Sequence, residues 1–399
     1  MSLTAFFMDD VFGHEDTIPT VGPSGESLAG PLANALNDRP RVVWQTDTNA
    51  YYCVDRGKYL DITEGGGSEL QVVLGFMNGT ADQVALKIQD TLNNSALTAL
   101  TYTVLYNPVS GRFEFKASGT FGILWLTGTH AAVSPHVRHW LGFSKVDDTG
   151  GTHYIAAEAR YGTDHWAVFR LGSPKRFTLA ACVLDGGEEV SFNDALNTVT
   201  LFGATSALST VERSRWVTGA AKTLTFSDRP SEDQNRIQVA FDTDGAEMGY
   251  EYWAFSWRYF DPDPFHAVGL IKGLVKYGST SRQIAQLKGH GLVDTTKPLN
   301  VKSYYPTQNL MTWRAPLIFD NWEASDYRAV VTEVIRNGRA RGLLWALRWS
   351  QIADATYAAD DEADKGFLIW AALQKYGQDD YGGAASDYIS GELTLEQVR

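Results

Sequence analysis

The chain has 399 residues, which is too long for one ordinary hydrophobic core and predicts two or three domains. Its contents of 44% hydrophobic and 20% charged residues are typical of a soluble globular protein. The formal net charge of −13 disfavours a nucleic-acid groove, because phosphate binding needs concentrated lysine and arginine. The short basic cluster Arg336, Arg339 and Arg341 lies beside Glu333, which favours a solvated edge or a salt bridge to a neighbouring subunit. We therefore expect no nucleic acid as a partner.

The cysteines and the start of the chain bear on the cellular compartment. Cys53 and Cys182 are far apart and form no CxxC pair, so we expect buried free thiols and assembly in a reducing cytoplasm. The segment 1–10 has no basic start, and its apolar run is too short for a signal peptide. No stretch approaches the about 20 apolar residues that a membrane helix requires. We expect no membrane insertion.

In chain order, residues 1–47 are rich in proline and glycine and predict loops that end in a strand over 41–46. Residues 48–157 predict an α/β module. Within it, alternation over 70–76 predicts a strand that buries Leu70, Val72, Leu74 and Phe76. The glycine runs 65–67 and 150–151 bracket much of the module and predict hinges.

A helix and a hairpin follow in the same module. Thr80 and Gln83 form a capping box ahead of the apolar positions Val84, Ile88 and Leu92, which predicts a helix. The alternating segments 102–106 and 112–116 flank an Asn-Pro-Val-Ser-Gly turn and predict a hairpin. Gly142 predicts a stop after the segment that ends at residue 141.

From residue 160 onward, short strands separated by turns predict an antiparallel sandwich or jelly roll. The predicted strands are 165–172, 177–184, 197–203, 224–226, 236–241, 250–259 and 266–271. In the segment 250–259, alternation assigns Trp253, Phe255 and Trp257 to the core, whereas Tyr250 and Tyr252 would face solvent or a partner.

The remainder, 279–399, predicts a further β-rich unit. Segments 327–335 and 342–349 flank Asn337 and Gly338 like a hairpin, and 388–399 alternates like a terminal strand. Segment 366–373 fits either a strand or a buried helix.

Two parts of the chain resemble known families. The strands that contain Val168–Gly172, Thr198–Gly203, Tyr250–Phe255 and Val268–Ile271 follow one another as in the discoidin (coagulation-factor 5/8 C-like) β-sandwich. The pieces from Thr80 to Asp148 resemble, in their order, an α/β insert of structural proteins from tailed-phage tails and fibres. The resemblance implies a mainly β protein with a discoidin-like antiparallel β-sandwich at 1–47 and 158–278, an inserted small α/β module at 48–157, and a C-terminal β-rich docking domain at 279–399.

This resemblance also implies a function. It points to a structural protein of a siphophage-type tail tip or baseplate, assembled in the bacterial cytoplasm and located in the virion tail. The implied partners are other tail and baseplate proteins, further copies in a threefold or sixfold ring, and a host-surface glycan. The alternative is a carbohydrate-binding receptor-recognition protein of the virion.

Catalytic motifs do not compete with this interpretation. The sequence has no GxxxxGK[ST], HExxH, GxSxG or Rossmann pattern, so we expect no enzyme and no cofactor. Asp261 and Asp263 offer two close carboxylates, the groups that act in glycoside hydrolysis. Pro262 and Pro264 favour a stiff loop there instead.

Two segments contain residue types that bind metal ions. His136 and His139 are three residues apart and could share a metal, but no further ligand has suitable spacing, which favours an ordinary surface helix. Segment 242–245 begins like a calcium loop, yet Trp253 stands where the bidentate glutamate belongs, which favours a plain turn. We expect no metal, with a calcium site built from distant loops as the alternative.

One ligand site is predicted from aromatic residues. Aromatic faces stack on sugar rings, and the candidates are Tyr250, Tyr252 and Trp216. Packing in the core and at an interface is the favoured interpretation of this aromatic cluster, and a glycan platform is the alternative.

Overall fold

We describe the protein in a computed structural model. It describes residues 4–8, 11–13, 15–37, 42–46, 51–55, 58–177, 179–184, 196–228, 237–241, 249–260, 267–280, 290–291, 311–320, 343–347, 367–376, 380–381 and 388–397. Strands predominate among them, and their sheets are antiparallel throughout, which confirms the predicted mainly β class.

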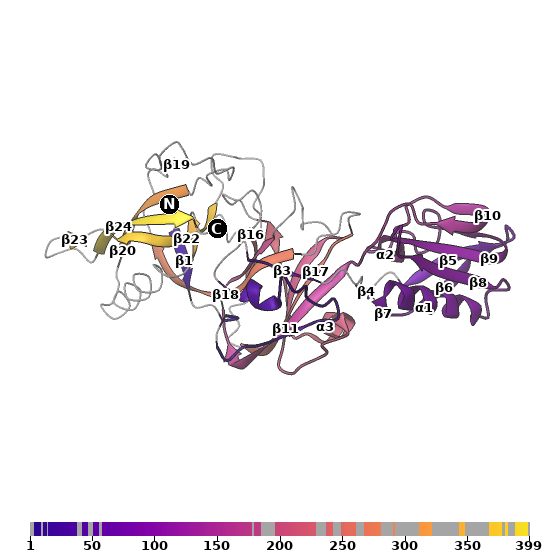
Figure 1. The fold of residues 1–399 in the computed structure, drawn as a ribbon, viewed down its shortest axis with the longest axis horizontal. Coiled ribbons are helices and arrows are strands. Elements are labelled where there is room, and N and C mark those ends of the chain that lie inside the picture. Colours follow the sequence, from indigo (N-terminus) through magenta and orange to yellow (C-terminus); the bar gives the residue numbers. More distant parts are fainter. Residues whose placement is uncertain are drawn as a thin grey trace.

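The insert is an α/β module, drawn in purple at one end of the molecule in Figure 1. Its main sheet has the order β10-β9-β5-β6, with β8 also paired to β9, and a separate ribbon pairs β4 with β7. The elements are β4 (Tyr51–Val54), β5 (Tyr59–Glu64), β6 (Leu70–Val73), β7 (Met77–Thr80), α1 (Ala81–Asn93), β8 (Tyr102–Asn107), β9 (Arg112–Ile123), α2 (Val137–Leu141) and β10 (Asp148–Ile155).

Most of the predicted elements of the insert are confirmed. Helix α1 begins with the capping box, in which Gln83 Oε1 accepts a hydrogen bond from the Thr80 backbone at 3.0 Å. Val84, Ile88 and Leu92 are buried. The β8–β9 hairpin forms as predicted, and Gly142 ends α2 with a left-handed φ of 77°.

Two predictions for the insert are wrong. Phe76 is 49% exposed and lies under the Lys58 ammonium, because β6 ends at Val73 and Gly75 turns the backbone with a φ of +74°. The glycine runs are not hinges. Residues 65–67 form the turn between β5 and β6, and residues 150–151 lie inside β10.

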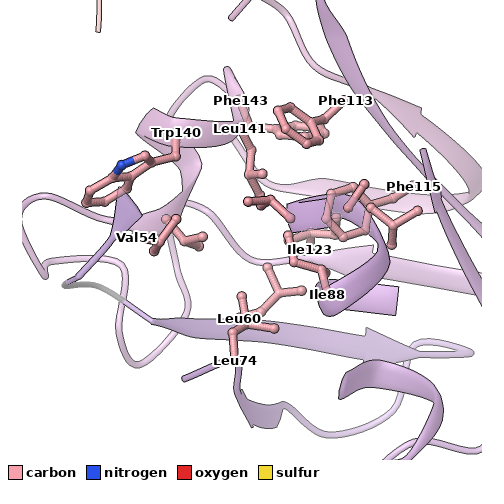
Figure 2. Packing of buried hydrophobic residues seen from close by; sticks show 14 of the residues in the cluster. Val54, Leu60, Leu74, Ile88, Phe113, Phe115, Ile123, Trp140, Leu141 and Phe143 are labelled. Atoms are coloured by element: carbon pink, nitrogen blue, oxygen red, sulfur yellow. The ribbon is translucent and has the colours of Figure 1, made fainter. Parts of the chain in front are cut away.

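The insert has its own hydrophobic core. Figure 2 shows side chains from β4, β5, α1, β9 and α2 converging, with Ile88 of the helix facing Phe115 and Ile123 of the sheet. All but one of the buried residues of this core come from residues 52–156, and the exception is Phe260, which follows the sandwich strand β17.

The sandwich forms the middle of the molecule in Figure 1, and its first layer is a five-stranded sheet in the order β14-β13-β17-β11-β2. Its elements are β2 (Ile18–Val21), η1 (Leu32–Leu36), β11 (Asp164–Lys175), β13 (Thr198–Ala204), α3 (Arg213–Gly219), β14 (Lys222–Thr225) and β17 (Tyr250–Arg258).

The second layer belongs to a sheet whose path is β15-β16-β12-β18-β1-β21-β22-β24-β20-β19, with β3 paired to β18 and β23 paired to β24. Its strands are β1 (Thr4–Met8), β3 (Trp44–Gln45), β12 (Leu179–Leu184), β15 (Ser227–Asp228), β16 (Ile237–Phe241), β18 (Ala267–Thr280), β19 (His290–Gly291), β20 (Met311–Asp320), β21 (Leu343–Leu347), β22 (Phe367–Tyr376), β23 (Asp380–Tyr381) and β24 (Tyr388–Gln397).

The core of the sandwich lies between these two layers. Phe169 and Phe255 of the first layer pack with Cys182 and Ile271 of the second. Trp44 meets Trp257 edge to face, with ring centroids 4.8 Å apart. Trp253 and Trp257 are buried, as alternation predicts, and both cysteines are buried free thiols, also as predicted.

A long strand links the sandwich to the C-terminal strands. Residues 268–274 of β18 pair with β12, and residues 275–280 pair with β1. Strand β1 also pairs with β21, so a segment near the start of the chain lies within the same sheet as β22 and β24. The sequence predicted only loops there.

In the C-terminal third, the predicted terminal strand is confirmed as β24, and segment 366–373 forms a strand, β22. The first arm of the predicted hairpin, 327–335, lies outside the described residues. Within the part of the chain that is described, no helix is long and apolar enough to cross a membrane.

Candidate ligand pocket beside a buried charge cluster

Four buried charged residues meet where the insert joins the sandwich. Asp55 follows β4 of the insert, Asp164 begins β11, Arg213 begins α3 and Arg258 ends β17. Each is at most 7% exposed. We call these four residues the junction cluster.

Arg258 lies at the centre of the cluster and uses every guanidinium nitrogen. Its Nε donates to Asp164 Oδ1 at 2.7 Å, Nη1 to Asp55 Oδ1 at 3.1 Å, and Nη2 to the Cys53 carbonyl at 2.9 Å. The planar fork of arginine allows these three acceptors to be reached at once. Its charge also lies 4.7 Å from the ring centroid of Trp140.

The other oxygen of Asp164, Oδ2, accepts three neutral donors. These are the Cys53 backbone at 2.8 Å, the Thr163 hydroxyl at 2.8 Å and the Trp140 indole at 3.1 Å. Because Cys53 and Trp140 belong to the insert while Asp164 begins a sandwich strand, this carboxylate joins the two units directly.

Arg213 is less fully compensated. Its Nη1 pairs with Asp55 Oδ2, and its Nε donates to Ser256 Oγ at 2.7 Å. Asp55 is shared with Arg258. Burial, together with repulsion from Arg258, lowers the pKa of Arg213. Burial also acts against the charge of Arg258, but Asp164 and Asp55 outweigh it and hold the pKa of Arg258 above its ordinary value.

A cavity of about 230 Å³ lies against this cluster. It is lined by Asp55, Pro135, Thr198, Thr200, Phe202, Arg213, Val217, Thr223, Thr225 and Arg258. Thr200 of β13 lies directly opposite Thr225 of β14, and Thr198 lies opposite Arg258 of β17. Thr223 and Thr225 are exposed, so the cavity meets solvent on the side of β14, the last strand of its sheet.

The lining offers groups that bind oxygen-rich ligands. Its threonines supply hydroxyl groups and its arginines supply guanidinium donors, which can hold hydroxyls and anionic oxygens.

The predicted sugar-stacking residues are not brought together. Trp216 is fully buried, and its Nε1 donates to the Ser209 carbonyl at 2.5 Å, so its ring offers no face to a ligand in this structure. Tyr252 is half-buried beside the same cluster as Trp216, with Arg170 over its ring. Tyr250 packs instead toward Trp253 and the sandwich core, 5.5 Å between centroids. The glycan platform stays a prediction.

The histidines do not lie on an exposed surface helix as expected: His136 is buried, His139 is half-buried, and α2 buries Val137, Trp140 and Leu141. His136 is 2% exposed, caps α2 and accepts a hydrogen bond from the Arg138 backbone at 3.2 Å. Burial, reinforced by Arg138, lowers the pKa of both His136 and His139 to about 4. Among the described residues, no group of three histidine, cysteine, aspartate or glutamate side chains could hold a metal. Segments 242–245 and 261–264 lie outside the described residues.

Sequence reasoning missed the junction cluster. A charged residue at a strand end is usually solvated, so nothing in the sequence marks Arg258 as buried. The other three members of the cluster are single charged residues with no shared motif. Only the fold brings them within reach of one another. No protein-family model, curated protein or solved structure matches the chain.

Proposed function

We propose that this chain is a structural component of a phage tail tip or baseplate, located in the virion tail, where copies pack into a threefold or sixfold ring with other tail proteins. Three features of the described residues support the proposal beside the resemblance in the sequence. They are an outward apolar surface on the insert, a rigid junction behind it, and a sheet that joins distant segments of the chain.

The apolar surface of the insert carries the proposal. Ten of the fourteen large hydrophobic side chains that are exposed in the described part of the chain belong to the insert. Leu105 and Ile155, which are 44% and 50% exposed, lie on either side of Glu114 on one sheet face. The opposite face of the same strand carries the buried Phe113 and Phe115. Exposed apolar side chains that gather on one sheet face are the kind of surface that a contact with another protein would bury.

The junction cluster gives that surface a fixed position. Asp164 and Arg258 together hold the insert by its backbone at Cys53 and by the Trp140 indole. Separating the insert from the sandwich would leave these buried charges and donors without their partners, which costs free energy and favours one arrangement of the two units. Copies in a closed ring need such defined angles between their contact surfaces.

The test is electron microscopy of the purified chain by negative stain, with antibody labelling of the intact particle. The proposal predicts rings with a central hole and label confined to the tail end. A Leu105→Glu variant should lose the rings. A Leu97→Glu variant alters an exposed apolar residue (52%) that lies outside the sheet face of Leu105 and Ile155, in the connection between α1 and β8, and it should keep them. Monodisperse monomers together with unlabelled particles would count against the proposal.

A further inference from the structure

The junction cavity contains an arginine with an unused donor. The Nε and Nη1 atoms of Arg213 have partners, whereas Nη2 has no acceptor among the described residues. The guanidinium lines the cavity although the residue is only 5% exposed. A buried guanidinium edge that is open to a cavity is a site for an anionic oxygen.

The distribution of hydrogen bonds in the cluster favours the same ligand group. Asp164 gives one oxygen to Arg258 and the other to three neutral donors. Asp55 is shared by both arginines. The two aspartates and two arginines balance in formal charge, but Arg213 forms its direct ion pair only with the shared Asp55, so its remaining donor edge is the part of the cluster that an anionic oxygen in the cavity would contact.

The rest of the lining selects hydroxyl groups. Four threonines line the cavity, two on β13 and two on β14: Thr198, Thr200, Thr223 and Thr225. A threonine hydroxyl both donates and accepts, so a row of them matches the hydroxyls of a polyol. Phe202, Val217 and Pro135 add apolar surface for the carbon skeleton. The cavity of about 230 Å³ has room for roughly eight waters, which corresponds to one small ring and not to an oligomer.

We propose that this cavity binds a small polyhydroxylated carboxylate, such as a sugar acid, with its carboxylate on Arg213 and its hydroxyls on the four threonines. The acid enters beside the exposed Thr223 and Thr225 on β14. It arrives either as a free molecule or as one residue of a polymer that bears such acids. This site is independent of the assembly function proposed above.

The experiment is calorimetric titration of the full chain with glucuronate. Glucose serves as the matched ligand without the carboxylate, and acetate as the carboxylate without the hydroxyls. Glucuronate should saturate the protein and bind at least tenfold more tightly than either, and added salt should weaken it. Equal binding of glucuronate and glucose, or no saturable binding, overturns the proposal.

Substitutions then place the ligand in the cavity. Thr225→Val removes one hydroxyl from an exposed position at nearly constant shape, and it should weaken glucuronate about fivefold. Thr152→Val, an exposed threonine of β10 far from the cavity lining, should leave the affinity unchanged. Arg213→Lys should weaken binding further, with circular dichroism used to verify that the variant is folded. Equal weakening by both threonine variants, or by neither, would sink the assignment.

A second titration, with a short oligomer of uronate residues, distinguishes a free acid from a residue of a polymer as the ligand. Tighter binding of the oligomer than of free glucuronate supports a polymer residue as the ligand. Binding of the free acid alone supports a small metabolite. Both results uphold the pocket, and failure of both ligands overturns it, whatever electron microscopy shows about ring assembly.

Discussion

Two clusters of charged side chains in this protein use similar contacts in opposite surroundings. In the junction cluster, Arg258 Nε lies 2.7 Å from Asp164 Oδ1, and both residues are at most 5% exposed. On the outer sheet face of the insert, Glu114 lies 3.2 Å from the Lys116 ammonium and 3.1 Å from His153 Nε2. There, the side chains of Lys116 and His153 are 43% and 39% exposed.

The difference lies in what replaces a lost partner. On the outer face, water reaches any charge that loses its partner, and surface ion pairs contribute at most about 1 kcal/mol. In the junction no water reaches Asp164, so losing it leaves the buried Nε of Arg258 and three neutral donors without an acceptor. The donor–acceptor distances are similar in the two clusters and do not predict which cluster contributes more to stability, whereas burial does.

The largest expected effect comes from Asp164→Asn. The substitution removes the main counter-charge of Arg258 and replaces one acceptor oxygen with a donor. We expect the free energy of unfolding to fall by about 3–5 kcal/mol, measured by urea denaturation followed by tryptophan fluorescence.

The control for that prediction is Glu212→Gln. This residue forms an ion pair with Arg215 at 2.8 Å, but both side chains are more than 40% exposed. Its loss should change stability by less than about 0.5 kcal/mol. Equal effects of the two substitutions would show that burial does not separate the clusters.

The next effect is a pH dependence from His136. Burial lowers its folded pKa to about 4, whereas the unfolded chain titrates near 6.5. Between these two values the unfolded state binds more protons than the folded state. Stability is therefore complete above pH 6.5 and is lost as pH falls toward 4.

A His136→Asn variant isolates this contribution, because asparagine keeps an acceptor for the helix cap and does not titrate. We expect the parent chain to lose about 2–3 kcal/mol more than the variant between pH 7 and pH 4, measured by urea denaturation at each pH. Parallel pH profiles would contradict the assignment.

Trp140→Phe should have a smaller effect at the junction. Phenylalanine keeps most of the ring against Arg258 but removes the indole donor that lies 3.1 Å from Asp164 Oδ2. Two other neutral donors remain on that oxygen. We expect a loss of about 1.5 kcal/mol. A matched Trp125→Phe variant removes a different indole hydrogen bond, to Asp148 at 2.9 Å, and leaves the junction intact.

The two clusters also mark the limit of what the sequence predicts. Local chemistry identified the α1 capping box, the β8–β9 hairpin and the core residues Trp253, Phe255 and Trp257 of β17, because each depends on neighbours a few residues apart. The pattern did not predict that the other face of β17 is buried as well. Phe76 was misassigned because the turn at Gly75 breaks the alternation. The junction cluster joins residues separated by up to 203 positions, and no local pattern encodes such contacts. Strand β1 was missed for the same reason, since its partners lie in β18 and β21.

The smallest expected effect is that of Glu114→Gln on the outer face. The hydrogen bond from Lys116, with a further contribution from His153, lowers the pKa of the Glu114 carboxyl. Its stabilisation is therefore present above the ordinary carboxyl pKa and is lost as pH falls below it. Because both partners are well exposed, we expect a change within about 0.5 kcal/mol at pH 7, and less in 1 M salt. A loss above about 2 kcal/mol in the purified protein would show that this face is covered by another copy, because an ion pair of this geometry has so large an effect only where water is excluded.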